Sequence, residues 1–399
     1  QPLAGAAPNI LFVSIDDLAP VSAVFNHPLF KAVTPNFDAF FDKATTFSYA
    51  HATVPLGNAS RASVLYGVDS DTSGIHTNED VHTTVRETFP SLPRLFNQAG
   101  WTTATAGKIF HDNIDRGDVD AFQIRGNESP GNDWQPASWV KSESDVFVTV
   151  ASPDVPDEAF FDMRNANAFR TFVSDAQQDP FFYAYGTIRP HTPLAVPQKY
   201  YDLYPLESIP LPDYGDEDLG DLAEMALAFS EFTNPGYSWT PGRNPFQTAD
   251  SDPTEMREAI RGYLAAVSYA DAVFGEIMAA LQASAHANNT AIVLWSDHGF
   301  HLGEKQHFAK FTLWEEGTRS PLAVMLPNGI GAGQVVDTTV SLLDLYKTVL
   351  DIAKLPVPGH AQGNSLLPLI QDPDTPWNRP AVTEMYGNYS VRTDEWRYI

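Results

Sequence analysis

Short, almost continuously apolar segments recur along this 399-residue chain, and several of them end in a polar or charged residue. Segments of this kind are typical of strands buried on both faces, as in a parallel sheet. Five are predicted as strands: NILFVSIDD (9–17), WTTATAGKIF (101–110), DPFFYAYGTI (179–188), AIVLWSDHG (291–299) and SPLAVMLPN (320–328).

Segments with helical features alternate with these strands. Helices are predicted within 34–45, 91–100, 253–285 and 340–355. This alternation predicts an α/β sandwich with a large, mainly parallel mixed sheet flanked by helices. We expect residues 1–375 to form that domain. Residues 376–399 have the pattern of a hairpin and would begin a small C-terminal antiparallel subdomain.

Two regions interrupt the alternation. Residues 112–160 and 205–252 are rich in Asp, Gly, Pro and Ser and show no clear periodicity. Long loops in a compact domain tend to be functional, so we expect these two to form walls of a substrate cleft.

The composition limits the possible partners. The formal net charge is −26, which argues against nucleic acids and anionic membranes. There is no cysteine, so a thiolate metal site and a thiol nucleophile are both excluded. No apolar run approaches the length of a membrane span. The first residues, QPLAGAAPN, lack the features of a signal peptide, and we expect them to be the remainder left after cleavage of one.

Acidic residues follow two of the predicted strands. Asp16 and Asp17 follow the first, and Asp297 and His298 follow the fourth. Ligands bind at the carboxyl ends of strands in open α/β sheets, and clustered carboxylates require a cation such as calcium or magnesium. The alternative is that each pair only caps a turn.

Candidate anion-binding groups are spread along the chain. Ser60 and Arg61 lie at a predicted helix start, which favours anions, although an ordinary loop-to-helix junction looks the same. Other candidates are Lys108, His111, His191, His301, Lys305, His307 and Lys310. Singly these are ordinary surface groups. Together they could bind a tetrahedral oxyanion and supply a general acid.

Five segments, in this order, resemble the formylglycine-dependent sulfatases of the alkaline-phosphatase-like superfamily, and most closely their iduronate-2-sulfatase-like branch. The family signature is Cys or Ser, any residue, Pro or Ala, then Ser-Arg and a later Leu-x-Gly. GNASRASVLYG (57–67) matches it except at the first position. The segments AGKIFH, RPHTP, SDHGFHLGE and FAKFTLWEEGTRSPL are also close to the branch, and the similarity covers nearly the whole chain.

The resemblance implies one divalent cation, calcium in this family, held by Asp16, Asp17, Asp297 and His298. It also implies a sulfated saccharide as substrate and a secreted or periplasmic location. His76 and His307 are candidates for a basic patch that binds this substrate.

The resemblance further implies catalytic roles for five residues around the nucleophile. Arg61 would steady the nucleophile, and Lys108 and Lys310 would hold the sulfate oxygens. His111 would assist turnover of the covalent intermediate, and His191 would face the leaving-group oxygen.

Gly57 occupies the position at which the family converts a Cys or Ser to formylglycine. The hydrated aldehyde of formylglycine attacks sulfur, which plain glycine cannot do. Three explanations are open: the letter stands for a formylglycine, the nucleophile was removed by an engineered change, or the chain is a pseudoenzyme that only binds sulfated ligands. The first is favoured because the supporting acids, lysines and histidines are all present.

The expected function is therefore hydrolysis of a sulfate ester, catalysed by formylglycine at position 57 and a divalent cation. The enzymatic alternative is hydrolysis of phosphonate or phosphate diesters, because the superfamily uses similar sites for both. The sequence leaves the oligomeric state unknown.

Overall fold

The structure of the protein is a computed structural model. It describes residues 6–111, 117–126, 149–152, 154–175, 180–212, 220 and 252–399. Most of the two regions predicted as cleft walls, 112–160 and 205–252, lies outside these residues, so their role stays a prediction.

An eight-stranded sheet forms the centre of the molecule, in the order β12-β2-β11-β8-β1-β6-β3-β4. Among the described strands, β11 runs antiparallel to both of its neighbours and the other pairs are parallel. The mainly parallel mixed sheet is thereby confirmed. Its strands are β1 (Asn9–Ile15), β2 (Thr45–His51), β3 (Thr102–Gly107), β4 (Ile124–Arg125), β6 (Phe181–Thr187), β8 (Thr290–Ser296), β11 (Arg319–Met325) and β12 (Val335–Ser341).

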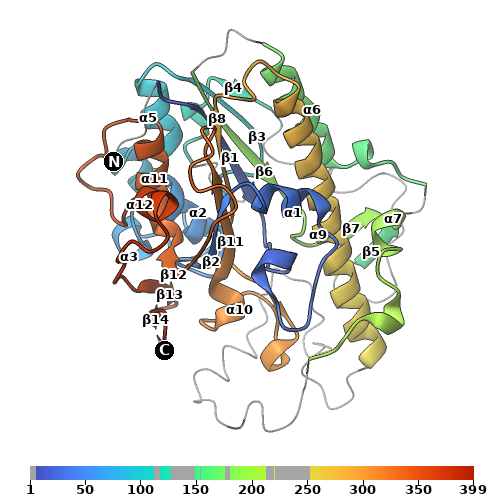
Figure 1. Ribbon diagram of the computed structural model, residues 1–399. Coiled ribbons are helices and arrows are strands. Elements are labelled where there is room, and N and C mark those ends of the chain that lie inside the picture. The colour runs from blue at the N-terminus through green and yellow to red at the C-terminus, as the bar shows by residue number, and fades with distance from the viewer. Residues whose placement is uncertain are drawn as a thin grey trace.

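Helices cover both faces of this sheet (Figure 1). Leu11 and Val13 of β1 face one apolar core and Ile10 and Phe12 the other, as the alternation of a strand requires. The first core is covered by α1 (Pro35–Phe41), α6 (Phe161–Val173), α7 (Gln198–Tyr201) and α9 (Pro253–Gln282). The second is covered by α2 (Gly57–Tyr66), α4 (Thr83–Thr88), α5 (Leu92–Gln98), α11 (Leu345–Ile352) and α12 (Leu367–Gln371).

By length and composition, α9 could cross a membrane, but 72% of its most apolar window is buried inside the protein. Its apolar residues Ile260, Leu264, Val267 and Phe274 belong to the same buried core as Leu11 and Val13 of β1. We therefore interpret α9 as the core helix of this layer.

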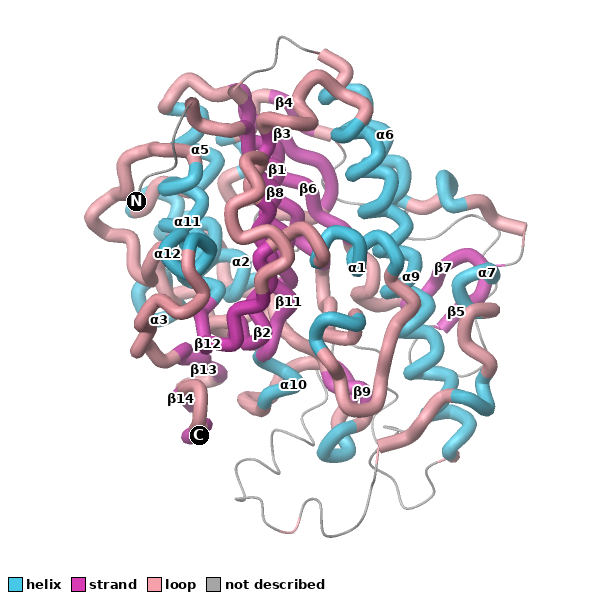
Figure 2. The backbone as a smooth tube through the Cα atoms, viewed as in Figure 1, coloured by secondary structure: helices cyan, strands magenta, loops and turns pink. Residues whose placement is uncertain are grey.

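The C-terminal residues form a small antiparallel sheet, as predicted (Figure 2). Its strands are β13 (Ala381–Met385), β14 (Asn388–Arg392) and β15 (Arg397–Tyr398). The backbone of Glu384 donates to Thr53 O at 2.8 Å, and Thr383 Oγ1 donates to Ala52 O at 2.6 Å. The small sheet is thus attached to the segment that joins β2 to α2.

The remaining described elements are short. Two-stranded pairs join β5 (Thr149–Ser152) to β7 (Leu194–Pro197) and β9 (His301–Leu302) to β10 (Phe308–Ala309). The short helices are α3 (Ser70–Ser73), α10 (Glu315–Thr318), η1 (Ala23–Phe25), η2 (Val119–Ala121), η3 (Asp157–Ala159), η4 (Leu206–Ser208), η6 (Glu304–Gln306) and η7 (Leu342–Asp344).

One predicted helix is too long. Residues 340–355 were expected to be helical, but Val340 and Ser341 belong to β12 and α11 begins only at Leu345. The boundary is a capping box in which Ser341 and Asp344 bond each other's backbone, which ends the strand and starts the helical turn. Strands β2 and β12 were not predicted at all.

Candidate active site

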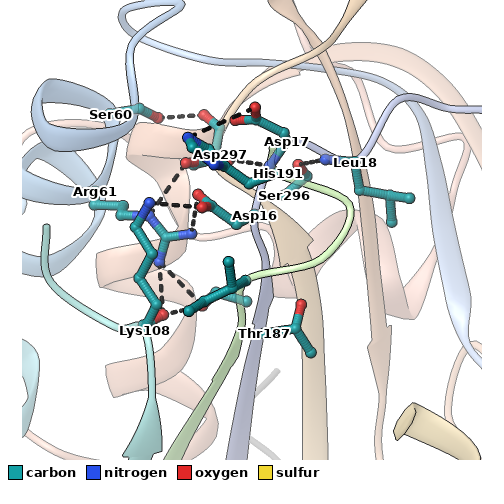
Figure 3. Close-up of polar contacts among 12 residues, drawn as sticks. Asp16, Asp17, Leu18, Ser60, Arg61, Lys108, Thr187, His191, Ser296 and Asp297 are labelled. Atoms are coloured by element: carbon teal, nitrogen blue, oxygen red, sulfur yellow. Dashed lines mark hydrogen bonds and ion pairs between the residues drawn. The ribbon is translucent and has the colours of Figure 1, made fainter. Parts of the chain in front are cut away.

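Acidic and basic residues meet at the carboxyl edge of the sheet. Ile15 of β1 pairs with Ser296 of β8, so Asp16 and Asp297 emerge side by side. Lys108 follows β3 at the same edge. Figure 3 shows the side chains converging from these strand ends.

Two glycines allow β3 and β6 to come close together here. A Cβ on Gly107 would lie 1.8 Å from Gly186 O, and a Cβ on Gly186 would lie 1.8 Å from Lys108 O. Gly107 also has φ +77°, a conformation that favours glycine. This close approach sets where Lys108 leaves the sheet.

Arg61 joins the three strand ends. Its guanidinium is fully buried; Nε lies 3.1 Å from Asp297 Oδ2 and Nη2 lies 2.9 Å from Asp16 Oδ1. Nη1 donates to the carbonyls of Lys108 and Ile109 at 2.9 and 3.0 Å. Burial opposes its charge, but Asp297 and Asp16 prevail and raise the pKa of Arg61.

Two lysines neutralise the aspartates of the first strand end. Lys108 Nζ lies 2.6 Å from Asp16 Oδ2, and Lys310 Nζ lies 2.5 Å from Asp17 Oδ1. Burial alone would raise the pKa of Asp16, but Lys108 and Arg61 hold it well below its usual range. Burial opposes ionisation of Asp17 too, and Lys310 lowers its pKa. Three carboxylates therefore face three cationic side chains.

Two histidines present an unprotonated nitrogen to this cluster. Nδ1 of His298 lies 2.8 Å from Gly299 O and Nδ1 of His191 lies 2.7 Å from Thr192 O. A carbonyl only accepts, so the neutral ring carries its proton on Nδ1 and leaves Nε2 as an acceptor. Burial lowers the pKa of both histidines.

The cluster fits a divalent cation. One ligand atom each of Asp17, Asp297 and His298 lies within 4.8 Å of the others, as do atoms of Asp16, Asp17 and His191. His298 Nε2 is buried, lies 3.3 Å from Asp17 Oδ1 and has no hydrogen-bond partner among the described residues. Carboxylate oxygens with one imidazole nitrogen are suitable ligands for such an ion.

Gly57 is the first residue of α2, and a side chain at this position would point at this cluster. A Cβ added to it would lie 3.1 Å from Asp297 Oδ2 and 3.4 Å from His111 Cδ2. Burial, followed by Lys108, lowers the pKa of His111 well below its usual value. Ser60 cannot stand in for a side chain at position 57, because its hydroxyl donates to Asp297 O at 2.5 Å.

The two predicted substrate-binding histidines lie in different settings. His76 is partly exposed, and its Nδ1 lies 3.1 Å from Glu384 Oε2. His307 is buried, packs against the ring of His301 and donates from Nε2 to Lys310 O. His307 thus holds the backbone of Lys310, and its role in substrate binding stays a prediction.

Sequence reasoning missed two residues that hold the site in place. Asn58 donates to Thr77 O and Asp80 O at 2.8 and 2.9 Å, which fixes the loop that follows α3 next to Gly57. Asp162 of α6 accepts the backbone N–H groups of the loop that carries His191. Asn58 occupies the variable position of the signature and Asp162 lies outside every quoted segment, so no local signal could have identified either residue.

Comparison with known proteins accords with this geometry. The sequence profile described as "Sulfatase" matches residues 8–355. A sulfatase of Formosa agariphila is 33% identical over 414 residues, covering 98% of this chain and 78% of the relative. Iduronate 2-sulfatase of Mus musculus is 27% identical over 401 residues, covering 88% of this chain and 69% of the relative.

A solved structure shows the same fold. The phosphonate monoester hydrolase of Agrobacterium radiobacter superposes with a TM-score of 0.80 at 18% identity, covering 98% of this chain and 86% of that one. At this identity the likeness concerns the fold alone. The profile match and the extent of the first alignment decide the family: the chain belongs to the sulfatases, whose members are sulfuric ester hydrolases.

Proposed function

We propose that the chain hydrolyses sulfate esters of a saccharide, using formylglycine at position 57 and one calcium ion held by Asp16, Asp17, Asp297 and His298. The observation that carries this proposal is the direction of residue 57. A side chain there would point between Asp297 and His111 at the start of a helix.

Two groups would complete the chemistry. A hydrated formylglycine would supply the hydroxyl nucleophile that glycine lacks. A divalent cation would supply positive charge that favours an ionised oxygen nucleophile.

The lysines would bind the sulfate oxygens. In the structure they pair with Asp16 and Asp17, the same carboxylates that the cation would use. A cation on these carboxylates would weaken both ion pairs and leave the ammonium groups available for sulfate. Charge-assisted hydrogen bonds to the transferring group favour the transition state.

The histidines would handle protons. His111 is held neutral by burial and lies beside position 57, so it can accept a proton from a hydroxyl there. His191 Nε2 lies 4.0 Å from Asp17 Oδ2. It could donate to a leaving-group oxygen only when protonated, which Asp17 favours and burial opposes.

The charge of the centre suits an anionic ester. Its carboxylates and cationic side chains balance, so a divalent cation would make it positive by two. The whole chain carries −26, which repels a sulfated glycan at long range. That repulsion is screened beyond roughly 8–10 Å at moderate ionic strength, whereas the buried centre is screened much less.

A saccharide substrate is favoured by the similarity to iduronate 2-sulfatase. We also propose a secreted or periplasmic location, as the resemblance to the family implies. From the hairpin pattern of residues 376–399 we propose a catalytic domain of residues 1–375 followed by a C-terminal subdomain. The state of residue 57 is tested by the mass of the peptide that contains it. A mass of unmodified glycine in a preparation that hydrolyses sulfate esters would contradict the formylglycine assignment.

The likeness to a phosphonate monoester hydrolase favours a second candidate, hydrolysis of phosphonate or phosphate esters. Turnover of 4-nitrophenyl sulfate and of a 4-nitrophenyl phosphonate ester by the same preparation separates the two. Binding of sulfated saccharides without turnover of any ester would instead support a pseudoenzyme with plain Gly57.

A further inference from the structure

A cavity away from the strand-end cluster lies between α3, η7 and the C-terminal sheet, on the side of the molecule where Figure 1 places α3 and β13. Its volume is about 250 Å³. That is below the roughly 300–1,000 Å³ of pockets that enclose drug-sized ligands. The cavity therefore has room for one small ring.

Two residues that line this cavity each carry a buried hydrogen-bonding atom without a partner among the described residues. Thr53 is 4% exposed, and its Oγ1 makes no hydrogen bond. Nε1 of Trp377, whose side chain also lines the cavity, is likewise buried and unpaired. Buried polar groups are rarely left in this state, so the wall suits a ligand that carries hydroxyl groups.

The rest of the lining includes four carboxylates, Asp69, Asp71, Asp344 and Glu384, and one cationic side chain, Arg379. Each carboxylate already accepts a hydrogen bond from the protein. Carboxylate oxygens have further lone pairs, so they can accept from a ligand as well. Their negative charge would repel a sulfate or a carboxylate.

These carboxylates do not form a metal site. Groups close enough to hold an ion occur, among the described residues, only at the strand ends of the active site. A neutral ligand with several hydroxyl groups is therefore the chemistry that the cavity fits. Trp377 contributes an aromatic ring to the lining, and Arg379 Cζ lies 5.8 Å from the centroid of that ring, so a ligand would pack on the part that Arg379 leaves uncovered.

We propose that this cavity binds an uncharged, unsulfated sugar unit, with its ring against Trp377 and its hydroxyls on Thr53 Oγ1 and the carboxylates. The proposal rests on the proposed action on saccharides. Thr53 lies four residues before Gly57, and its carbonyl accepts from Glu384 N at 2.8 Å. A neutral unit of the substrate glycan would thus be held beside the segment that leads to the catalytic helix.

Binding of lactose and of N,N′-diacetylchitobiose to the full chain, measured by calorimetry and by saturation-transfer NMR, tests the proposal. At least one of these sugars should bind. Trp377→Ala should weaken that binding by about tenfold, because it removes the stacking face. Trp377→Phe should keep much of the affinity, and Arg379→Ala should change it little because the ligand is uncharged.

Thermal melting shows whether each variant is still folded, because Trp377 packs against the second apolar core and its loss lowers the melting temperature. No binding of either sugar, or binding that Trp377→Ala leaves unchanged, would overturn the proposal. Tighter binding of lysine methyl ester than of the sugars would also overturn it and would indicate a basic peptide. Sugar binding in a protein without sulfatase turnover would contradict the proposed function while supporting this cavity.

Discussion

Arg61 Nε lies 3.1 Å from Asp297 Oδ2, and neither side chain has any exposed surface. A buried charge without a partner is costly. Removing one member of this pair should therefore destabilise the fold more than removing both. The same guanidinium also bonds Asp16 and two carbonyls after β3. Stability and active-site geometry therefore depend on one side chain.

Replacing Arg61 with Ala should lower the free energy of unfolding by about 3–5 kcal/mol, the usual cost of stranding a buried charge. Arg61→Lys should recover part of this loss, because it restores the charge but not the planar fork. Urea unfolding measures both variants, with the exposed Arg170→Ala as control. An unchanged midpoint for Arg61→Ala would show that the network is not structural.

Lys108→Ala should reduce kcat by on the order of a hundredfold or more, since it removes a donor to the transferring group. KM should change much less if the lysine acts mainly in the transition state. Steady-state kinetics on a sulfate ester, with the exposed Lys43→Ala as matched control, decide this. A change in KM alone would assign Lys108 to ordinary substrate binding.

Asp162 should affect activity because it holds the loop that carries His191. Asp162 is buried and accepts from Ile188 N at 2.8 Å and Arg189 N at 3.0 Å. Asp162→Asn keeps an oxygen for one of these donors, and Asp162→Ala keeps none, so the loss of activity should be larger in the alanine variant.

The leaving group distinguishes this positioning effect from simple destabilisation. If His191 protonates the leaving oxygen, both Asp162 variants should lose more activity on an alkyl sulfate than on 4-nitrophenyl sulfate, whose phenolate needs no acid. Equal losses on the two substrates would show that the loop only stabilises the fold.

The ion pairs between α10 and the C-terminal sheet should make stability depend on pH. Burial alone would raise the pKa of Glu315, but His51 and Arg397 lower it to about 2. Burial lowers the pKa of His51 to about 3, so Arg397 supplies the positive charge over most of this range. A folded-state pKa below the usual value adds stability above pH about 4.5 that is lost as the pH falls towards about 2.

Glu315→Gln should remove this contribution, which is at most about 3 kcal/mol. The difference in unfolding free energy between parent and variant should therefore shrink between pH 5 and pH 3. The neighbouring Glu316→Gln is a control of opposite sign, because burial raises the pKa of Glu316. A difference that stays constant with pH would contradict the assignment.

Chelation of the divalent cation should abolish activity and lower the melting temperature, because a ligand that binds only the folded state stabilises it. Adding calcium back should restore both. Asp297→Asn should lower the affinity for calcium as well as the activity, which calcium titration can follow separately. Full activity after exhaustive chelation would contradict a metal at this site.

The strands that were predicted are those whose own residues indicate burial on both faces. β1, β6 and β8 are continuously apolar because both of their faces are covered. β2 was missed because TTFSYAH mixes polar and apolar residues. It is a strand because β11 and β12 supply partners on both sides, and Ser48 bonds Asp337 across 289 positions.

The candidate site likewise contains residues that the sequence predicts and residues that it does not. Asp16, Asp297 and Arg61 were predicted because strand ends and a helix start are visible in the sequence. Asn58 and Asp162 were not, because each acts on backbone groups 19 to 27 positions away. The backbone groups that these side chains bond are brought near them only by the tertiary structure, so no pattern in a single sequence identifies the contacts.

The balance between carboxylates and ammonium groups at the strand ends has a thermodynamic consequence. A cation must compete with Lys108 and Lys310 for Asp16 and Asp17, so it binds more weakly than it would to free carboxylates. A sulfate ester gives the displaced ammonium groups a new partner. Cation and ester should therefore bind with positive cooperativity, each raising the affinity of the other by the same factor. The metal-free chain, neutral at its centre, can fold before either ligand arrives.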